Sequence, residues 1–257
     1  MKKLLLIMMS LAAVAVVSCK KGDDNKDNKE PEGPKYRIKT LSYTEGDNLK
    51  TAEDAEWFDT WTYSYDDQGR VINVTRGSDE KDWTFAYNDK TVTVTRKSDQ
   101  AVVMTLTLND NGVCTAIKDE WDETSVFEYD ATLRPTKITK EGELRSIITL
   151  RDNCLVSWTK EKDNAKRIFT YNTTKNIGDL HAIYSEAVDP PARWMYETGL
   201  FGKGPAYLPL SSEWEGRPET HSDLACEVDE NGYRVLEKKV FDGGWTEMFV
   251  ITWEEIK

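Results

Sequence analysis

The sequence lacks the motifs that most readily identify an enzyme. It contains no Gly-x-Ser-x-Gly, no His-Glu-x-x-His and no cysteine and histidine in a known nucleophile–base arrangement. Its only two histidines, His181 and His221, lie 40 residues apart, which disfavours a metal shared between them and Asp179 or Asp223. The 46 acidic side chains leave a carboxylate pair for glycoside hydrolysis open. We expect no metal and no cofactor, and a hydrolase is the least favoured class of function.

Positive charge is also scarce. The chain has 34 basic and 46 acidic side chains, a net charge of −12, and the balance without residues 1–18 is 32 to 46, or −14. A field of this sign without a basic patch argues against nucleic acid and anionic lipid surfaces as partners. Residues 35–257 also lack an apolar run of the roughly 20 residues that a membrane-spanning helix needs.

Cysteine is sparse as well. Apart from Cys19 there are Cys114, Cys154 and Cys226, an odd number, so at least one thiol stays unpaired within the monomer. None has the spacing of a zinc ligand, and we expect each to be a small buried apolar side chain. A pairing of Cys226 with either of the other two stays open.

The N-terminus predicts export and lipid attachment. Lys2 and Lys3 precede an apolar stretch of about 15 residues, which has the form of a secretory signal and is too short to span a bilayer. Val16-Val17-Ser18-Cys19 resembles the bacterial lipobox, in which the cysteine is acylated and becomes the first residue of the mature chain. The resemblance implies a signal peptide over residues 1–18 and a membrane anchor on Cys19.

Residues 19–34 follow as the lipidated cysteine and a polar tether. The tract after Cys19 has no apolar residue and cannot bury surface, so we expect it to be disordered. It resembles the acidic export signals that send lipoproteins to the cell surface in Bacteroidota, and a solvated spacer is the alternative. The expected location is the outer membrane, lipid-anchored and facing the cell exterior if the export signal operates.

An internal repeat indicates the fold. Residue pairs led by an aromatic or leucine recur at intervals of 22, 21, 21, 21 and 21 residues, and each pair opens a turn rich in Asp, Asn and Gly. The pairs are Tyr65-Asp66, Tyr87-Asn88, Leu108-Asn109, Tyr129-Asp130, Leu150-Arg151 and Tyr171-Asn172. A period of 21 residues holds two short strands and two turns, which predicts one β-hairpin per repeat.

The strands alternate between apolar and polar residues. In the first strands one parity is aromatic or aliphatic, as in Trp61, Tyr63 and Tyr65, and the other is mostly threonine and serine. We therefore predict an all-β fold, an antiparallel up-and-down meander of about 14–16 strands that forms a barrel-like or strongly curled soluble sheet. Residues 35–257 form its single domain. A barrel of this size is too wide for its own side chains to fill, so a plug or a hollow is expected.

Strand spacing bears on the thiols. Cys114 and Cys154 fall in hairpins that are two apart in the predicted meander. Four strand spacings then separate them, a distance of roughly 19 Å. A disulfide needs α-carbons within about 7 Å, so this pair is not expected to be bonded.

Two resemblances follow from these motifs. Tyr65-Asp66-Asp67-Gln68-Gly69-Arg70-Val71 resembles the tyrosine–aspartate repeat of RHS-type shell proteins, which supports stacked hairpins. The lipobox, the Tyr-Asp hairpins and the segment from Gly199 to Pro209 resemble uncharacterised Bacteroidota lipoproteins, a domain of unknown function with a porin-like fold. That family has no assigned activity, so the resemblance implies a fold and an envelope location.

The repeat is interrupted between Asn172 and Val228, which predicts an insertion at about residues 176–222. Asp189-Pro190-Pro191 has the form of a helix start, and a short helix is expected to end at Gly199. One interpretation is a plug that covers the open end of the sheet. The other is a ligand-binding surface of aromatic side chains: Trp194, Tyr196, Tyr207 and Trp214.

These observations favour a cell-envelope lipoprotein that binds a ligand, such as a glycan or a peptide, as a surface-exposed binding or accessory module. The alternative is a structural or partner-docking envelope protein. Exposed aromatics in the insertion would favour the first, and buried aromatics with a charged outer sheet the second.

Overall fold

A computed structural model describes residues 35–55, 59–77, 82–162, 164–181 and 193–256. The signal peptide, Cys19, the tether and the helix cap at Asp189 all lie outside these residues, so their expectations stay predictions. The described segments belong to one compact unit, Pro34–Lys257.

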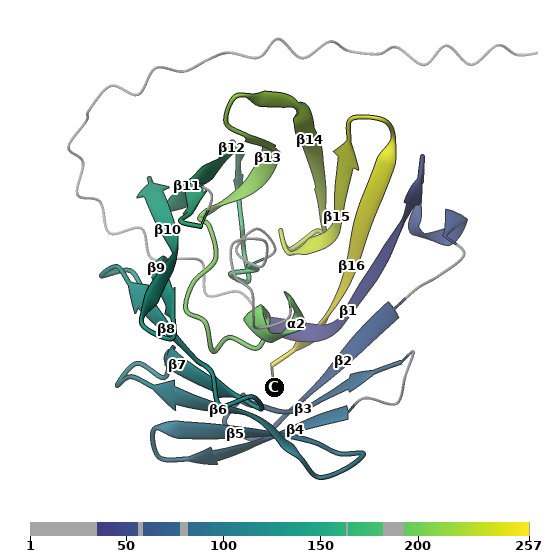
Figure 1. Cartoon of the computed structure of the whole chain (residues 1–257). Helices are drawn as coiled ribbons and strands as arrows, with labels where there is room; N and C mark the ends of the chain where they lie inside the picture. The colour runs from purple at the N-terminus through teal and green to yellow at the C-terminus, as the bar shows by residue number, and fades with distance from the viewer. Residues whose placement is uncertain (1–34, 56–58, 78–81, 163, 182–192, 257) are drawn as a thin grey trace, which may run out of the picture. The chain divides into compact units, whose positions relative to one another are not determined.

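The sixteen strands of the described residues form one antiparallel up-and-down meander, as the repeat predicted, and this sheet closes into a barrel (Figure 1). Each strand pairs with its neighbours in sequence, and β1 closes the barrel against β16 from Tyr36↔Glu255 to Asp47↔Trp245. The strands are β1 (Tyr36–Asp47), β2 (Asp59–Tyr65), β3 (Val71–Arg76), β4 (Asp82–Asn88), β5 (Thr91–Arg96), β6 (Val102–Leu108), β7 (Cys114–Asp119), β8 (Thr124–Tyr129), β9 (Pro135–Lys140), β10 (Glu143–Arg151), β11 (Cys154–Lys160), β12 (Ala165–Lys175), β13 (Tyr207–Trp214), β14 (Arg217–Val228), β15 (Arg234–Phe241) and β16 (Trp245–Glu255).

Five turns share one hydrogen-bonding scheme. In the turn after β2, the Asp66 carboxylate accepts from the backbone N–H of Gln68 (3.0 Å) and of Arg70 (2.9 Å), and Gly69 has a φ of 78°. The same two side-chain contacts recur at Asn109, Asp119, Asp130 and Asp229. An Asx side chain that mimics a backbone acceptor fixes such a turn, and this explains why Asp or Asn begins these turns.

The tyrosine before the turn connects hairpins. The hydroxyls of Tyr65, Tyr87, Tyr129 and Tyr171 donate to backbone carbonyls on β1, β3, β7 and β11 at 2.6, 3.0, 2.6 and 2.7 Å. Burial raises the pKa of Tyr87 to about 12, so this hydroxyl stays a donor near neutral pH. These contacts mark one end of the barrel, which we call the tyrosine end.

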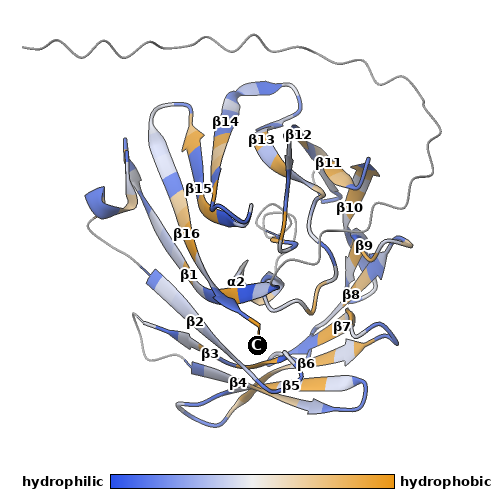
Figure 2. Cartoon of the chain, turned by 180° about the vertical axis from the view of Figure 1, so that it is seen from behind, coloured by the Kyte–Doolittle hydropathy of each residue, from blue (hydrophilic) through white to orange (hydrophobic). Residues whose placement is uncertain are grey.

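The barrel interior is apolar and its outer face is polar. Inward side chains such as Val74, Leu106 and Phe127 are buried, while outward positions carry contacts such as Thr170–Ser211 (2.6 Å) and Lys137–Glu128 (2.7 Å). Figure 2 shows hydrophobic and hydrophilic residues interspersed along the strands. A lipid-facing barrel has the opposite arrangement, with an apolar outer band and a polar interior.

The tyrosine end is filled by residues 193–206, which we call the plug. It contains the four-residue helix α2 (Arg193–Tyr196), which lies inside the ring of strands in Figure 1. The indole of Trp194 stacks on Trp83 with ring centroids 4.5 Å apart, and Phe201 meets Phe127 edge-on at 5.6 Å. No helix in the described part of the chain is long and apolar enough to cross a membrane.

The predicted insertion is wider than the segment that leaves the sheet. Within the predicted range 176–222, residues 207–214 form β13 and residues 217–222 the first half of β14. The repeat pattern fades there because β13 contains Pro209 and turns a serine, Ser212, toward the interior.

The three cysteines of the described residues are free thiols; Cys114 and Cys154 are buried, as expected, whereas Cys226 is half-buried. Burial raises the pKa of Cys114 and Cys226 to about 12 and also raises that of Cys154. Since the thiolate is the reactive form, we expect almost no reaction of native residues 20–257 with a thiol reagent at pH 8. In denaturant three thiols per chain should react within minutes. Fast labelling of the native protein would contradict the described burial.

Candidate functional site

At the end of the barrel opposite the tyrosine end, the interior contains a cavity of about 510 Å³, within the usual range for ligand pockets. We call it the mouth cavity. Trp214 and Phe241 are the last residues of β13 and β15, and Trp61 and Arg167 lie near the starts of β2 and β12, which places the cavity at this end. It is lined by Leu41, Tyr43, Trp61, Trp158, Arg167, Trp214, Lys239, Phe241, Glu247 and Phe249.

The lining residues occupy one side of the barrel. They come from β11, β12, β13, β15, β16, β1 and β2, which belong to one arc of eight neighbouring strands. On the other side, the plug aromatics Trp194 and Phe201 pack on β4 and β8. The plug therefore fills the tyrosine end against one wall and leaves the mouth lined by the other.

Aromatic rings form two pairs in this lining. Trp158 and Trp214 have ring centroids 5.3 Å apart, and Tyr43 and Phe249 lie 4.7 Å apart. The indole N–H of Trp158 is buried and has no hydrogen-bond partner among the described residues, and the same holds for Trp61. A buried unsatisfied donor costs about 1–3 kcal/mol, so this wall is not optimised for core stability alone.

Polar side chains lie on the strands between these aromatic rings: Arg167 on β12, between the strands of Trp158 and Trp214, and Lys239 on β15. Arg167 donates from Nη2 to the Ser212 hydroxyl (2.9 Å), which in turn contacts the Ser222 hydroxyl (2.8 Å), and all three side chains are buried. Lys239 is also buried; its ammonium lies 3.9 Å from the Glu247 carboxylate and 4.5 Å from the ring of Phe241. These residues place polar groups in an otherwise aromatic wall.

The four residues predicted to bind a ligand lie in different places. Only Trp214 lines the mouth cavity. Trp194 and Tyr196 are core residues of the plug, 5% and 1% exposed, while Tyr207 is half-buried at the first position of β13. Tyr207 and Trp214 are the first and last of the eight residues of β13, seven steps or roughly 23 Å apart. The four therefore do not form one surface in this structure.

Most of the mouth cavity was not predicted from the sequence. Trp61 and Trp158 belong to the apolar inward parity, and nothing in the sequence distinguishes a ring at the mouth from one in the core. A signal was present in Arg167 and Lys239, because a charged residue in the inward register of a strand interrupts the alternation. Arg167 shares the parity of Phe169, and Lys239 that of Phe241.

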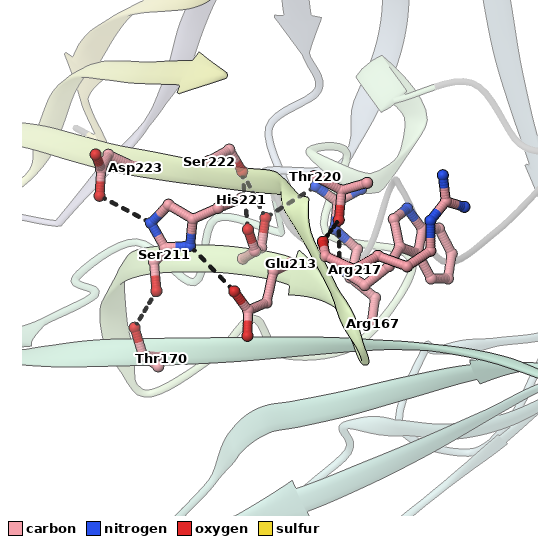
Figure 3. A network of polar contacts seen from close by, with 11 residues as sticks. Arg167, Thr170, Ser211, Glu213, Arg217, Thr220, His221, Ser222 and Asp223 are labelled. Carbon is pink, nitrogen blue, oxygen red and sulfur yellow. Dashed lines mark hydrogen bonds and ion pairs between the residues drawn. The ribbon is translucent and has the colours of Figure 1, made fainter. Parts of the chain in front are cut away.

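The two histidines lie in different environments. His181 is buried beside the plug, and its ring nitrogen Nε2 lies 3.0 Å from the Gly202 carbonyl. His221 is on the outer side of β14 between Glu213 (3.3 Å) and Asp223 (3.2 Å), as Figure 3 shows. No cluster of three potential metal ligands occurs among the described residues.

The comparisons with known proteins agree at the level of fold. No family model and no curated protein matches the sequence. A porin-like protein from Bacteroides uniformis is similar in structure, with a TM-score of 0.64 and 19% identity over 84% of this chain and 98% of that one. The fold is thus a porin-like β-barrel, as the resemblance to the lipoprotein family implied.

Two toxin structures give weaker matches. The TcdB2-TccC3 structure matches 77% of this chain at 13% identity, and the Tc holotoxin pore of Photorhabdus luminescens matches 82% at 12% identity. Each match has a TM-score of 0.30 and covers 10% of the larger chain.

Proposed function

We propose that this protein is a lipoprotein of the bacterial envelope, anchored through Cys19, whose barrel binds a saccharide in the mouth cavity. The observation that carries the proposal is a cavity of about 510 Å³ that is walled by six aromatic side chains and contains three charged ones. Aromatic faces stack on the C–H faces of sugar rings, and polar groups between them fix the orientation of a ligand.

The position of the N-terminus supports this role. Tyr36, the first residue of β1, pairs with Glu255, and its N–H lies 3.3 Å from the hydroxyl of Tyr233 in the turn before β15. The barrel therefore begins at the tyrosine end. A tether from Cys19 that joins the barrel there leaves the mouth cavity at the end away from the attachment point, where a large glycan has access.

A structural envelope protein is the second candidate, favoured by one observation. The plug aromatics predicted to bind are buried, and the outer face of the sheet carries ion pairs. This arrangement accounts for the plug and the outer face, but it gives no reason for a lined cavity at the mouth.

The proposal predicts saccharide binding that depends on Trp214. A glycan and peptide screen with residues 20–257 should give saccharide ligands, and Trp214→Ala should weaken their binding about 10-fold or more in calorimetry, since loss of an aromatic anchor typically costs 2 kcal/mol or more. Trp121→Ala is the matched control, because Trp121 is 73% exposed on the turn after β7. It should leave binding unchanged.

Circular dichroism of each variant separates loss of binding from loss of fold. A protein that binds no saccharide, or whose binding is indifferent to both Trp214→Ala and Trp158→Ala, would contradict the proposed function. The search would then turn to protein partners of the outer face.

A further inference from the structure

We infer that the mouth cavity binds the end of a neutral oligosaccharide chain, and that Trp245 at the rim stacks on a sugar further along the same chain. This inference rests on the proposed function and adds the class of saccharide and the way it is bound. Three features of the mouth carry it: the cavity is closed on its inner side, its charges are balanced, and an exposed tryptophan continues its wall outward.

The mouth cavity ends inside the barrel. Along β16 the inward side chains become less exposed with depth, from 23% for the Glu247 side chain to 4% for Phe249 and for Ile251. β1 shows the same change, from the half-buried Tyr43 to Leu41, which is 4% exposed. A sugar chain that enters at the rim therefore meets closed packing at the level of Leu41 and Phe249.

The space behind this level is too small for a sugar. A second cavity, which shares Leu41 and Phe249 with the first, has a volume of about 10 Å³, room for about one water molecule. It is bounded on the far side by Glu197 of the plug and by the buried ion pair between Arg234 and Glu237. A saccharide therefore enters and leaves the mouth cavity through the same opening. Such a pocket accepts the end of a chain, whereas the middle of a chain would need a groove that is open at both ends.

The charged groups at the mouth are balanced. The lining contains Arg167, Lys239 and Glu247, and Glu45 lies opposite Glu247 in the pairing of β1 with β16. Asp47 follows Glu45 in the same register at the rim. The two cations are thus matched by carboxylates, and no excess of positive charge attracts an acidic sugar. Together these groups offer both donors and acceptors, which suits hydroxyl groups because a hydroxyl both donates and accepts.

Trp245 continues the wall of the cavity outward. It is the first residue of β16 and shares the inward register of Glu247 and Phe249, because the pairing with β1 has no shift between Trp245 and Thr252. Trp245 is 41% exposed, and two steps along the strand, or roughly 7 Å, separate it from Glu247. An exposed indole at the opening of an aromatic-lined pocket provides a surface for the part of a ligand that stays outside.

The distance between floor and rim sets the length of chain that contacts both. Four steps along β16, or roughly 13 Å, separate Trp245 from Phe249. A disaccharide held at the floor would leave Trp245 uncovered, and several sugars in a row are needed to reach it. The affinity should therefore rise with chain length until Trp245 is covered, and stay constant in longer chains.

The test uses residues 20–257, which include every strand of the closed barrel, with the disaccharide and the hexasaccharide of five neutral series: malto-, cello-, xylo-, manno- and N-acetylchito-oligosaccharides. We expect at least one series to bind, the hexasaccharide about 10-fold more tightly than the disaccharide in calorimetry. A long polymer of the same sugar should bind one protein molecule per chain, because each chain has one end of the kind that the cavity accepts. A barrel that held the middle of a chain would instead bind in numbers that rise with polymer length.

Three tryptophan positions locate the effect. Trp245→Ala should reduce the affinity for the hexasaccharide about 10-fold and so remove its advantage over the disaccharide. Trp245→Phe keeps an aromatic face and should retain most of this advantage. Trp214→Ala should weaken both lengths, because Trp214 lines the cavity itself. The matched control is Trp121→Ala, which removes an exposed indole from the turn between β7 and β8, outside the arc that lines the cavity, and should leave both affinities unchanged.

The outcomes separate the inference from the proposed function. Equal affinity for both lengths, several protein molecules on one polymer chain, or a length advantage that survives Trp245→Ala would each overturn the inference and leave saccharide binding in place. The same conclusion holds if the screen yields only charged saccharides and none of the five neutral series binds. If no saccharide of any kind binds to protein that is folded by circular dichroism, the proposed function is wrong and the inference with it.

Discussion

Replacing Gly202 with alanine will destabilise the barrel much more than replacing Gly69, although both glycines have a left-handed φ, of 79° and 78°. A Cβ at Gly69 would meet nothing within 4 Å, whereas one at Gly202 would lie 2.1 Å from the carbonyl oxygen of Leu133. The plug would have to move off the turn after β8, which breaks the hydrogen bond from Lys203 N–H to that carbonyl (2.8 Å).

For Gly69→Ala we expect a loss of roughly 1–2 kcal/mol in the free energy of unfolding, the cost of the left-handed backbone. For Gly202→Ala the loss should be about 4 kcal/mol or more. The displaced packing of the plug and the broken hydrogen bond from Lys203 add to the cost of the left-handed backbone. Urea denaturation followed by circular dichroism measures both. Equal losses would show that the plug does not press against the Leu133 turn as described.

Acid will destabilise the barrel through His181. Burial, with smaller contributions from the cations of Arg234 and Arg134, lowers the pKa of His181 to about 4, although the hydrogen bond with the Gly202 carbonyl acts in the opposite direction. Because a carbonyl only accepts, Nε2 carries the proton in that contact, and the fold favours the neutral ring. The backbone N–H of His181 lies 3.1 Å from a carboxylate oxygen of Glu197, which packs against the same site.

The sign follows from the lowered pKa. The stabilisation is complete above the unfolded pKa of about 6.5 and is lost as the pH falls through the folded value of about 4. A difference of this size corresponds to about 3 kcal/mol. His181→Gln keeps a side-chain N–H for the Gly202 carbonyl but does not titrate. Between pH 6.5 and 4 the free energy of unfolding of His181→Gln should therefore fall by about 3 kcal/mol less than that of the wild-type protein. Urea titrations at the two pH values measure this difference.

His221 provides the contrast within the same chain. Its hydrogen bond with Asp223 raises the pKa, followed by the one with Glu213, so its stabilisation is present below about 6.5 and is lost as the pH rises through the raised value. At 36% side-chain exposure the effect should stay below about 1 kcal/mol. NMR titration should place the two histidines on opposite sides of the ordinary value. If His181→Gln loses as much stability between pH 6.5 and 4 as the wild-type protein does, His181 is not the group that causes the loss in acid.

The fold was predictable because two local signals repeat. The Asx turn fixes five of the hairpins through contacts within five residues, as at Asp66, and alternation fixes which face is inward. Local periodicity carries no information on whether the last strand meets the first, so barrel closure was left open. In β13 the alternation is weakened by Pro209 and the inward Ser212, so the strand was assigned to the insertion.

The candidate site was less predictable for a related reason. Trp194 and Trp214 look alike in sequence as aromatic residues of the same irregular segment, yet one stacks in the core and the other lines the mouth. The difference depends on which wall of the barrel each packs against, β4 for Trp194 and β11 for Trp214, which is a property of the closed structure. From the sequence, Arg167 and Lys239 could be recognised only as charged residues at inward positions. That both lie at the same end of the barrel follows only from the strand order in the closed structure.

The pairing of β1 with β16 also governs when the protein can fold. Tyr36 and Glu255 are partners although 219 positions separate them, and the strands between them pair only with near neighbours in sequence. A chain that emerges from a ribosome or a translocation pore N-terminus first can form hairpins at once, but β1 stays an unpaired edge until the last strand arrives. Such edges recruit other chains, and long-range pairing is slow. Loss of β16 would therefore leave an aggregation-prone open sheet with an exposed apolar lumen, rather than a slightly smaller barrel.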